Sequence, residues 1–268
     1  MNTFVFVILA LLLQLKFGTG DPFLLSLEEH DYTPTRVWLL DSAHHTVSPN
    51  SHSLYAVLHD VHLAPGPFND SINGSLEFRG DPSSYVEIPN TDGDLNATSV
   101  FSWVMTIKPT AVNVDGVILE YWDGTGGVRL MQAQNQLGAE AQDTNGKVYR
   151  IKTDKVALRK DRWTFLTLTF MGFNKMKFKL MYDDYDSETV DEKEDMDVVN
   201  NTVLRGTGDV RIGASRDPTL PAFSGKVACL RYYDKHIAKY REVHIYPLTC
   251  DPASGIFPLD SLSGESCL

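Results

Sequence analysis

Alternating apolar and polar positions dominate this chain wherever a regular pattern can be followed. In Val100–Lys108 the apolar side chains occupy every second position, and the same period returns in Lys175–Tyr182 with lysines between the apolar residues. A period of two is that of a β-strand with one buried face. Because almost no helix is available to cover such faces, each must pack against a second sheet. The pattern therefore predicts an all-β sandwich of two antiparallel sheets with very little helix.

Further short segments with strand character are separated by turn residues. They are Arg36–Leu40, Ser75–Phe78, Tyr85–Ile88, Gly116–Trp122, Val128–Gln132, Lys147–Ile151, Leu166–Phe170 and Asp209–Gly213. The stretch Leu58–Leu63 also fits a strand better than a helix. Helical turns are expected only at Glu242–Tyr246 and Lys155–Leu158. The segment Asp183–Asp197 holds nine carboxylates and a single lysine, which predicts a solvated loop.

The N-terminus has the features of a targeting segment. Thr3–Leu15 is almost wholly apolar and is followed by the small residues Gly18-Thr19-Gly20. The run is shorter than the ~20 residues of a membrane span, and it matches a secretory signal peptide over residues 1–20. We expect a secreted, extracellular protein without a membrane span. The mature chain then divides into an N-terminal segment contributing the first strands (21–74), the main domain (75–246) and a cysteine-containing tail (247–268).

Five segments occur in a fixed order over roughly residues 75–246: Leu76–Pro89 with its Gly-Asp turn, Phe101–Pro109, Arg162–Leu168, Asp209–Gly213 and Phe223–Ile237. Taken in this order, they resemble the laminin G-like domains of the concanavalin A-like lectin and glucanase superfamily, which also includes pentraxin-like proteins. Val37–Asp41 is similar to the first strand of that family. The resemblance implies a jelly-roll sandwich, but the fold carries many functions, so it does not identify a ligand. One departure is that Tyr182 leads into the acidic segment, where the family has a glycine turn.

The formal charge of −11 argues against nucleic acid as a partner. Divalent cations, mineral surfaces or basic partners suit an acidic chain better. Hard oxygen ligands that converge from loops favour Ca²⁺, and domains of the resembled family often hold calcium at a rim of the sandwich. The candidate ligands are Asp92, Asp94, Asp123 and Asp217. Ordinary turn-forming aspartates are the competing interpretation.

Four sequons predict N-glycosylation, at Asn69, Asn73, Asn96 and Asn200. Three cysteines lie near the C-terminus, which in an oxidising compartment predicts one bridge and one cysteine left over. Many laminin G-like domains have a bridge that ties the last core strand to the C-terminal segment. That comparison favours Cys229–Cys250, while Cys250–Cys267 stays open. The remaining thiol could link two chains into a dimer.

No motif for catalysis is recognisable in the sequence. Glucanases of the resembled fold need two glutamates and an aspartate on one strand face, and the nearest approaches, Glu192–Asp197 and Glu120–Asp123, lack that arrangement. We therefore expect a non-catalytic extracellular-matrix or adhesion-type binding protein, acidic and associated with glycans, calcium or mineral. Exposed aromatics such as Tyr121, Trp122 and Tyr149 are candidates for stacking on sugars, with core packing as the alternative. The competing functions are a calcium-dependent pentraxin-like lectin and, least favoured, a glycan hydrolase.

Overall fold

The computed structural model describes residues 35–38, 40, 56–67, 74–122, 124–153, 158–171, 176–182, 193–195 and 202–235, with only the backbone described at 171, 176–182 and 193–195. All of them lie within one compact unit, Pro34–Leu268. These residues form fifteen strands and no helix. Within these ranges there is accordingly no helix long and apolar enough to cross a membrane.

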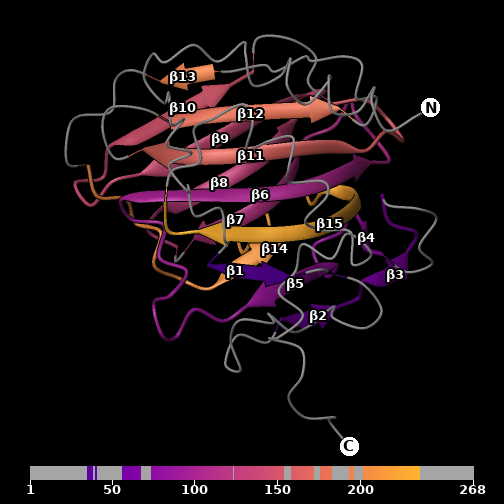
Figure 1. Cartoon of the computed structure of the whole chain (residues 1–268), viewed down its shortest axis with the longest axis horizontal. Helices are drawn as coiled ribbons and strands as arrows, with labels where there is room; N and C mark the ends of the chain where they lie inside the picture. Colours follow the sequence, from indigo (N-terminus) through magenta and orange to yellow (C-terminus); the bar gives the residue numbers. More distant parts are fainter. Residues whose placement is uncertain are drawn as a thin grey trace, which may run out of the picture. The chain divides into compact units, whose positions relative to one another are not determined.

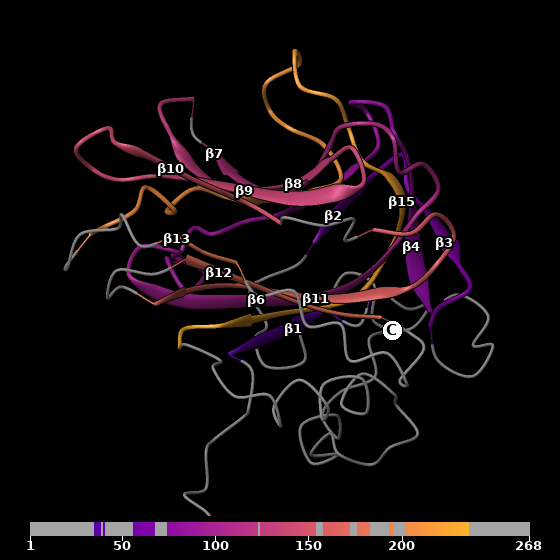
Figure 2. The ribbon, with the colours of Figure 1, turned by 90° about the horizontal axis from the view of Figure 1, so that it is seen from above.

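The strands form two antiparallel sheets that pack face to face (Figures 1 and 2). The eight-stranded sheet has the order β13-β12-β11-β6-β15-β4-β3, with β1 also paired to β15. The seven-stranded sheet has the order β10-β9-β8-β7-β14-β5-β2. The all-β sandwich predicted from the pattern is therefore confirmed. The bounds are β1 (Arg36–Trp38), β2 (Val57–His59), β3 (His62–Ala64), β4 (Ser75–Arg79), β5 (Tyr85–Ile88), β6 (Val100–Pro109), β7 (Gly116–Trp122), β8 (Gly127–Ala133), β9 (Gln136–Gln142), β10 (Val148–Lys152), β11 (Thr164–Met171), β12 (Met176–Tyr182), β13 (Lys193–Asp195), β14 (Val210–Ile212) and β15 (Ser224–Tyr233).

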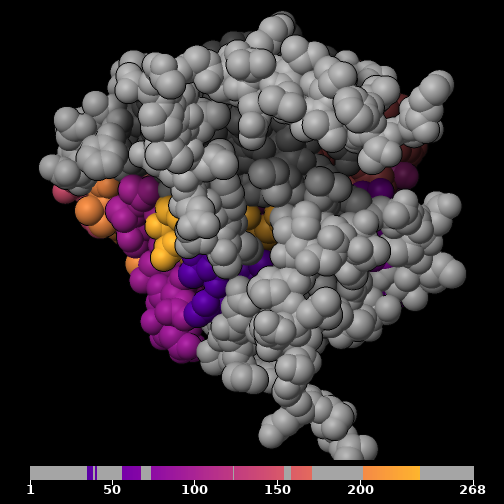
Figure 3. Space-filling view, viewed as in Figure 1, coloured from indigo at the N-terminus to yellow at the C-terminus, as the bar shows by residue number. Residues whose placement is uncertain are grey.

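An aromatic cluster occupies the core between the two sheets. Trp103 on β6 is fully buried and lies against Trp38 and Tyr232, with ring centroids 6.0 and 5.1 Å away. Its indole Nε1 donates to the Tyr121 hydroxyl at 3.1 Å, and that hydroxyl donates to the Leu95 carbonyl at 2.6 Å. Burying one large apolar side chain stabilises the fold by about 1.5–3 kcal/mol, so the cluster joins the sheets at their centre. In the view of Figure 3, β6, β15 and β1 are seen in magenta, yellow and indigo.

The structure differs from the strand predictions in three places. The segment Gln136–Gln142 forms β9, which the pattern did not indicate because its inward residues are mostly alanines. The strand expected over Leu58–Leu63 is in fact two strands, β2 and β3, which pair in different sheets. Asp60 separates them with a φ of 45°, a turn conformation that aspartate tolerates better than most residues. The third difference is in the acidic segment, where Lys193–Asp195 pairs with β12 as an edge strand instead of lying in a loop.

Other sequence predictions fall outside the described residues. These are the signal peptide, the helical turn at Glu242–Tyr246, all but the last residue of the helical turn at Lys155–Leu158, and most of the acidic segment. Strands β1, β2 and β3, which come from residues 21–74, pair with β15, β5 and β4. The N-terminal segment thus adds strands to both sheets.

Candidate functional site

A row of alternating charges crosses the outer face of the seven-stranded sheet. The inward neighbours of these residues on each strand belong to the core, so their own side chains lie on the opposite face. Strand register places the six residues side by side, and we call them the charge row: Arg150, Glu140, Arg129, Glu120, Arg211 and Glu87. Opposite charges at facing positions stabilise a sheet, whereas like charges destabilise it.

Burial in the charge row is deepest at its centre. The side chain of Arg150, on the edge strand β10, is 69% exposed, whereas Arg129 is 7% exposed and Glu120 is fully buried. Arg129 Nε lies 2.9 Å from Glu120 Oε2. A buried carboxylate is tolerated only when it is paired and hydrogen-bonded.

Glu120 also anchors the loop between β14 and β15, which stands over the outer face of this sheet (Figure 2). Ser215 Oγ donates to Glu120 Oε2 at 2.6 Å, and the Arg216 amide donates to Oε1 at 2.8 Å. One carboxylate therefore connects β7, β8 and this loop. We refer to residues 213–223 as the covering loop.

Trp122 follows Glu120 at the next outward position of β7. The Arg129 guanidinium lies over one face of its indole, 4.1 Å from the ring centroid. A cation at this distance is attracted by the π-system and restricts the orientation of the ring. Through Arg129, the same buried carboxylate that holds the covering loop also supports Trp122.

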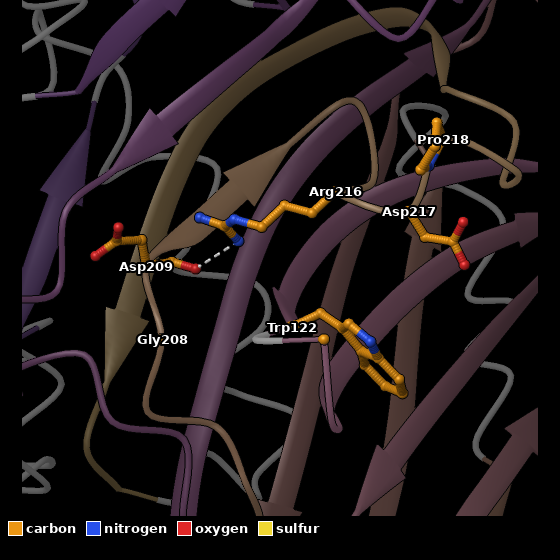
Figure 4. A pocket seen from close by; sticks show the side chains of 7 residues that line it. Trp122, Gly208, Asp209, Arg216, Asp217 and Pro218 are labelled. Carbon is orange, nitrogen blue, oxygen red and sulfur yellow. Dashed lines mark hydrogen bonds between the residues drawn. The ribbon is translucent and has the colours of Figure 1, made fainter.

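A pocket of about 660 Å³ opens beside Trp122, between the β7–β8 turn, the segment before β14 and the covering loop (Figure 4). The Arg216 guanidinium donates from Nη1 to the Asp209 carbonyl at 3.0 Å, and its Nη2 lies 3.3 Å from Glu87 Oε2. The residues lining the pocket are Trp122, Gly124, Gly208, Asp209, Arg216, Asp217 and Pro218.

Asp217 supplies an ionised carboxylate to this pocket. Its Oδ1 accepts hydrogen bonds from the Thr219 hydroxyl at 2.7 Å and the Thr219 amide at 2.9 Å. These bonds favour the charged form and lower the pKa of Asp217 below its ordinary value. A partly exposed carboxylate that also has an aromatic ring nearby is suited to accept hydrogen bonds from ligand hydroxyls.

The predicted calcium ligands lie in separate surroundings. Asp217 is in the pocket, whereas Asp94 pairs with Arg36 and Asp92 accepts a hydrogen bond from the Thr91 hydroxyl. Asp123 lies outside the described residues. In the described part of the chain, no group of three or more His, Cys, Asp or Glu side chains could hold a metal ion. Specific calcium binding stays a prediction.

The aromatic predictions divide between core and surface. Tyr121 is fully buried in the aromatic core, and desolvation raises its pKa well above the ordinary value. Tyr149 is buried as well, with its hydroxyl donating to Asp143 Oδ2 at 3.1 Å. The alternative interpretation, core packing, is therefore confirmed for both tyrosines, and stacking on a sugar is wrong for them, because their strand positions point inward. Trp122 is the one of the three that reaches the surface.

The modification predictions are only partly within the described structure. Asn96 is half-buried, and its Oδ1 accepts a hydrogen bond from Asn90 at 2.9 Å. The sequons at Asn69, Asn73 and Asn200 fall outside the described ranges, as do Cys250 and Cys267. Cys229 is buried on β15 where the pairing with β6 shifts register, and it has a φ of 51°. Glycosylation and the disulfide pairing both stay predictions.

Sequence reasoning missed Arg129, Arg216 and Gly208, and it considered Glu120 only as a catalytic carboxylate. The structure shows that both oxygens of Glu120 are already occupied by protein donors. The signal available in the sequence was the outward position of Glu120 and Arg129 on adjacent alternating strands. Their pairing depends on register, which the pattern alone does not specify.

No protein-family model and no curated protein matches this chain. Solved structures do match. The binding domain of botulinum neurotoxin serotype G has a TM-score of 0.63 at 11% identity and covers 81% of this chain. The serotype D ligand binding domain in complex with N-acetylneuraminic acid has a TM-score of 0.57 at 13% identity and covers 81%. The receptor binding domain of the C/D mosaic serotype has a TM-score of 0.56 at 12% identity and covers 80%.

This chain spans about half the length of those structures, 51% in each case. At such low identity the likeness shows the fold alone. The β-sandwich is therefore shared with domains whose names describe binding, while the pocket must be interpreted from its own residues.

Proposed function

We propose that this chain is a non-catalytic glycan-binding module whose ligand occupies the pocket beside Trp122. The observation that carries the proposal is the juxtaposition of Trp122, held from one side by Arg129, with the partly exposed carboxylate of Asp217. The apolar face of a sugar ring stacks on an aromatic side chain, and its hydroxyls donate to carboxylates. The pocket offers both kinds of contact within about 660 Å³, a volume in the range of small-ligand sites.

The structural neighbours support a binding role. The neighbours are described as binding domains, and one of them is in complex with a sugar acid, N-acetylneuraminic acid. These descriptions belong to the neighbours. For this chain they favour a binding role over a catalytic one.

The setting we propose is extracellular. A secreted, N-glycosylated protein would meet glycans on matrix components or cell surfaces, as in adhesion-type modules. The competing form of this function is a calcium-dependent lectin. Among the described residues, Asp217 is the predicted calcium ligand that lines the pocket. Binding measured with and without a chelator separates the two, because only the calcium-dependent form loses its ligand when the ion is removed.

Gly208 provides a direct test of the pocket. A side chain added there would meet no atom within 4 Å, and its φ lies outside the range that disfavours substitution. Gly208→Leu should therefore fill the pocket while leaving the fold intact. The matched control is Val114→Leu, which adds bulk at an exposed position in the loop before β7, at the end of that strand opposite Trp122.

The experiment uses a printed glycan array and the purified protein. We expect the unmodified chain and Val114→Leu to bind the same set of glycans, and Gly208→Leu to lose them. Replacing Trp122 by Leu should weaken binding about 5- to 15-fold, since aromatic stacking contributes about 1–3 kcal/mol per ring on nucleic-acid bases and we expect sugars to be at the lower end of that range. Unchanged binding by folded Gly208→Leu would exclude this pocket as the site.

A further inference from the structure

We infer that the pocket selects uncharged sugars and discriminates against sugars that carry a carboxylate or sulfate. The inference rests on the proposed function and adds the chemical class of the ligand. It differs from what the sugar acid bound to one structural neighbour would suggest for this chain. Two observations carry the inference. The arginines Arg129, Arg211 and Arg216 already form ion pairs with carboxylates of the protein, and the carboxylates near the pocket outnumber these arginines.

Arg129 and Arg211, which lie beside the pocket, are each paired with a carboxylate of the protein. Arg129 is paired with Glu120 at 2.9 Å and is almost fully buried under the indole. Arg211 donates to Glu87 Oε2 from Nη2 at 2.7 Å and from Nε at 3.1 Å, and its guanidinium stacks on Tyr85 at 4.0 Å. Neither guanidinium is placed to receive an anion from the pocket.

Arg216 is the cation that lines the pocket itself, and it is held on two sides. Its Nη1 donates to the Asp209 carbonyl, and its Nη2 approaches Glu87. Figure 4 shows the guanidinium turned toward Asp209 and away from Asp217. A ligand carboxylate would have to take Arg216 away from these contacts, because an arginine recognises a carboxylate best through two parallel hydrogen bonds.

The carboxylates at the pocket, in contrast, exceed the cations. Asp209 and Asp217 line it, and both accept hydrogen bonds from uncharged donors: Asp209 from the Asn90 amide at 2.8 Å and Asp217 from Thr219. The three arginines Arg129, Arg211 and Arg216 face four carboxylates, which are Glu87, Glu120, Asp209 and Asp217. Among these seven described side chains the carboxylates exceed the guanidinium groups by one, and the whole chain carries −11.

A negative pocket repels a second anion but accepts hydroxyl donors. The Asp217 carboxylate stays ionised at neutral pH, so an anionic substituent placed near it meets like-charge repulsion in a partly desolvated site. Hydroxyl groups of a neutral sugar can donate to the same carboxylate. Specificity of this kind arises from the unfavourable interaction with the wrong ligand as much as from contacts with the right one.

The test compares matched glycans on the array and in solution. For every neutral glycan bound by the purified protein, binding of the same glycan bearing a terminal sialic acid or a sulfate is measured by titration calorimetry. We expect the acidic form to bind at least tenfold more weakly. We also expect neutral binding to change less than twofold between about 50 and about 500 mM NaCl, since no ligand charge is involved.

A variant separates charge repulsion from steric exclusion. Asp217→Asn keeps the size of the side chain and an acceptor for Thr219 but removes the charge, so it should narrow the difference between the neutral and the acidic glycan. Equal or tighter binding of the acidic forms by the unmodified protein would overturn the inference while leaving the proposed function in place. If the ratio of the affinities for the neutral and the acidic glycan is the same in Asp217→Asn as in the unmodified protein, charge repulsion by Asp217 is not the cause of the discrimination. Absence of binding to any glycan would instead refute the proposed function, and the inference with it.

Discussion

The buried pair Glu120–Arg129 allows a quantitative test of how the site is held together. Glu120 is fully buried and accepts three hydrogen bonds, from Arg129, the Ser215 hydroxyl and the Arg216 amide. Replacing it with Leu leaves Arg129 as an uncompensated charge at 7% exposure. Removing one partner of a buried ion pair costs about 3–5 kcal/mol. We expect Glu120→Leu to lower the free energy of unfolding by that amount.

The assay is urea denaturation followed by tryptophan fluorescence, arranged as a double-mutant cycle. Arg129→Met should also be strongly destabilising, since it leaves Glu120 buried without its cation. The double variant should be less destabilised than the sum of the two, with a coupling of about 2 kcal/mol or more, because contacting residues are not additive. Additive effects, or a loss below 1 kcal/mol for Glu120→Leu, would refute the reasoning.

The charge row contains its own control. Arg150 pairs with Glu140 at 2.7 Å, but its side chain is 69% exposed. Surface pairs of this kind contribute about 0–1 kcal/mol, so Arg150→Met should change stability by less than 1 kcal/mol. Hydrogen exchange gives a local readout: in Glu120→Leu the Arg216 amide should exchange faster, because it loses its acceptor, while amides in the core strand β6 should change less.

Three further predictions follow from the geometry. Gly213→Ala should lower the free energy of unfolding, measured in urea, by about 2–4 kcal/mol, because Gly213 has a φ of +93° and a Cβ there would lie 2.1 Å from Phe78. The control Gly208→Ala should change it by no more than about 0.5 kcal/mol, since a Cβ there would meet no atom within 4 Å. Desolvation raises the pKa of Tyr121 and Tyr232 above the value in the unfolded chain, so the free energy of unfolding should have its full value below about pH 10 and decrease as pH rises further. Tyrosinate absorbance of these residues should appear together with unfolding. Their ionisation in a protein that is still folded would contradict this. Hydrogen bonds from Thr219 lower the pKa of Asp217, so its carboxylate stays charged as pH falls from 7 to 5 and glycan binding should persist over that range. In Thr219→Val the pKa of Asp217 should be higher, so glycan binding should be lost at a higher pH than in the unmodified protein.

The sequence predicts much of the fold because inward and outward residues alternate clearly in most strands. β5 and β7 have the bounds expected from the pattern, and β6 differs by one residue. The pattern fails where the inward side chains are small. In β9 the inward residues are Leu137, Ala139 and Ala141, and two alanines give too weak a contrast with their polar neighbours.

The site could not be predicted in the same way, because its parts come from distant segments. Glu120 and Ser215 are 95 residues apart in the sequence, and nothing near Glu120 indicates that a loop covers it. An isolated glutamate on the outer face of a strand is normally solvated. Strand register changes this interpretation, because it places Glu120 between Arg129 and Arg211. The ion pair with Arg129 offsets the desolvation cost of burying the carboxylate.

The pocket lies where the charge row meets the covering loop, and this position orders the side chains that line it. The covering loop excludes water from Glu120, so Glu120 and Arg129 have little freedom to rearrange. Arg129 in turn packs on the Trp122 indole, and Asp217 belongs to the covering loop that Glu120 binds. A ligand that stacks on Trp122 and donates to Asp217 therefore meets groups ordered before it arrives, which lowers the entropic cost of binding.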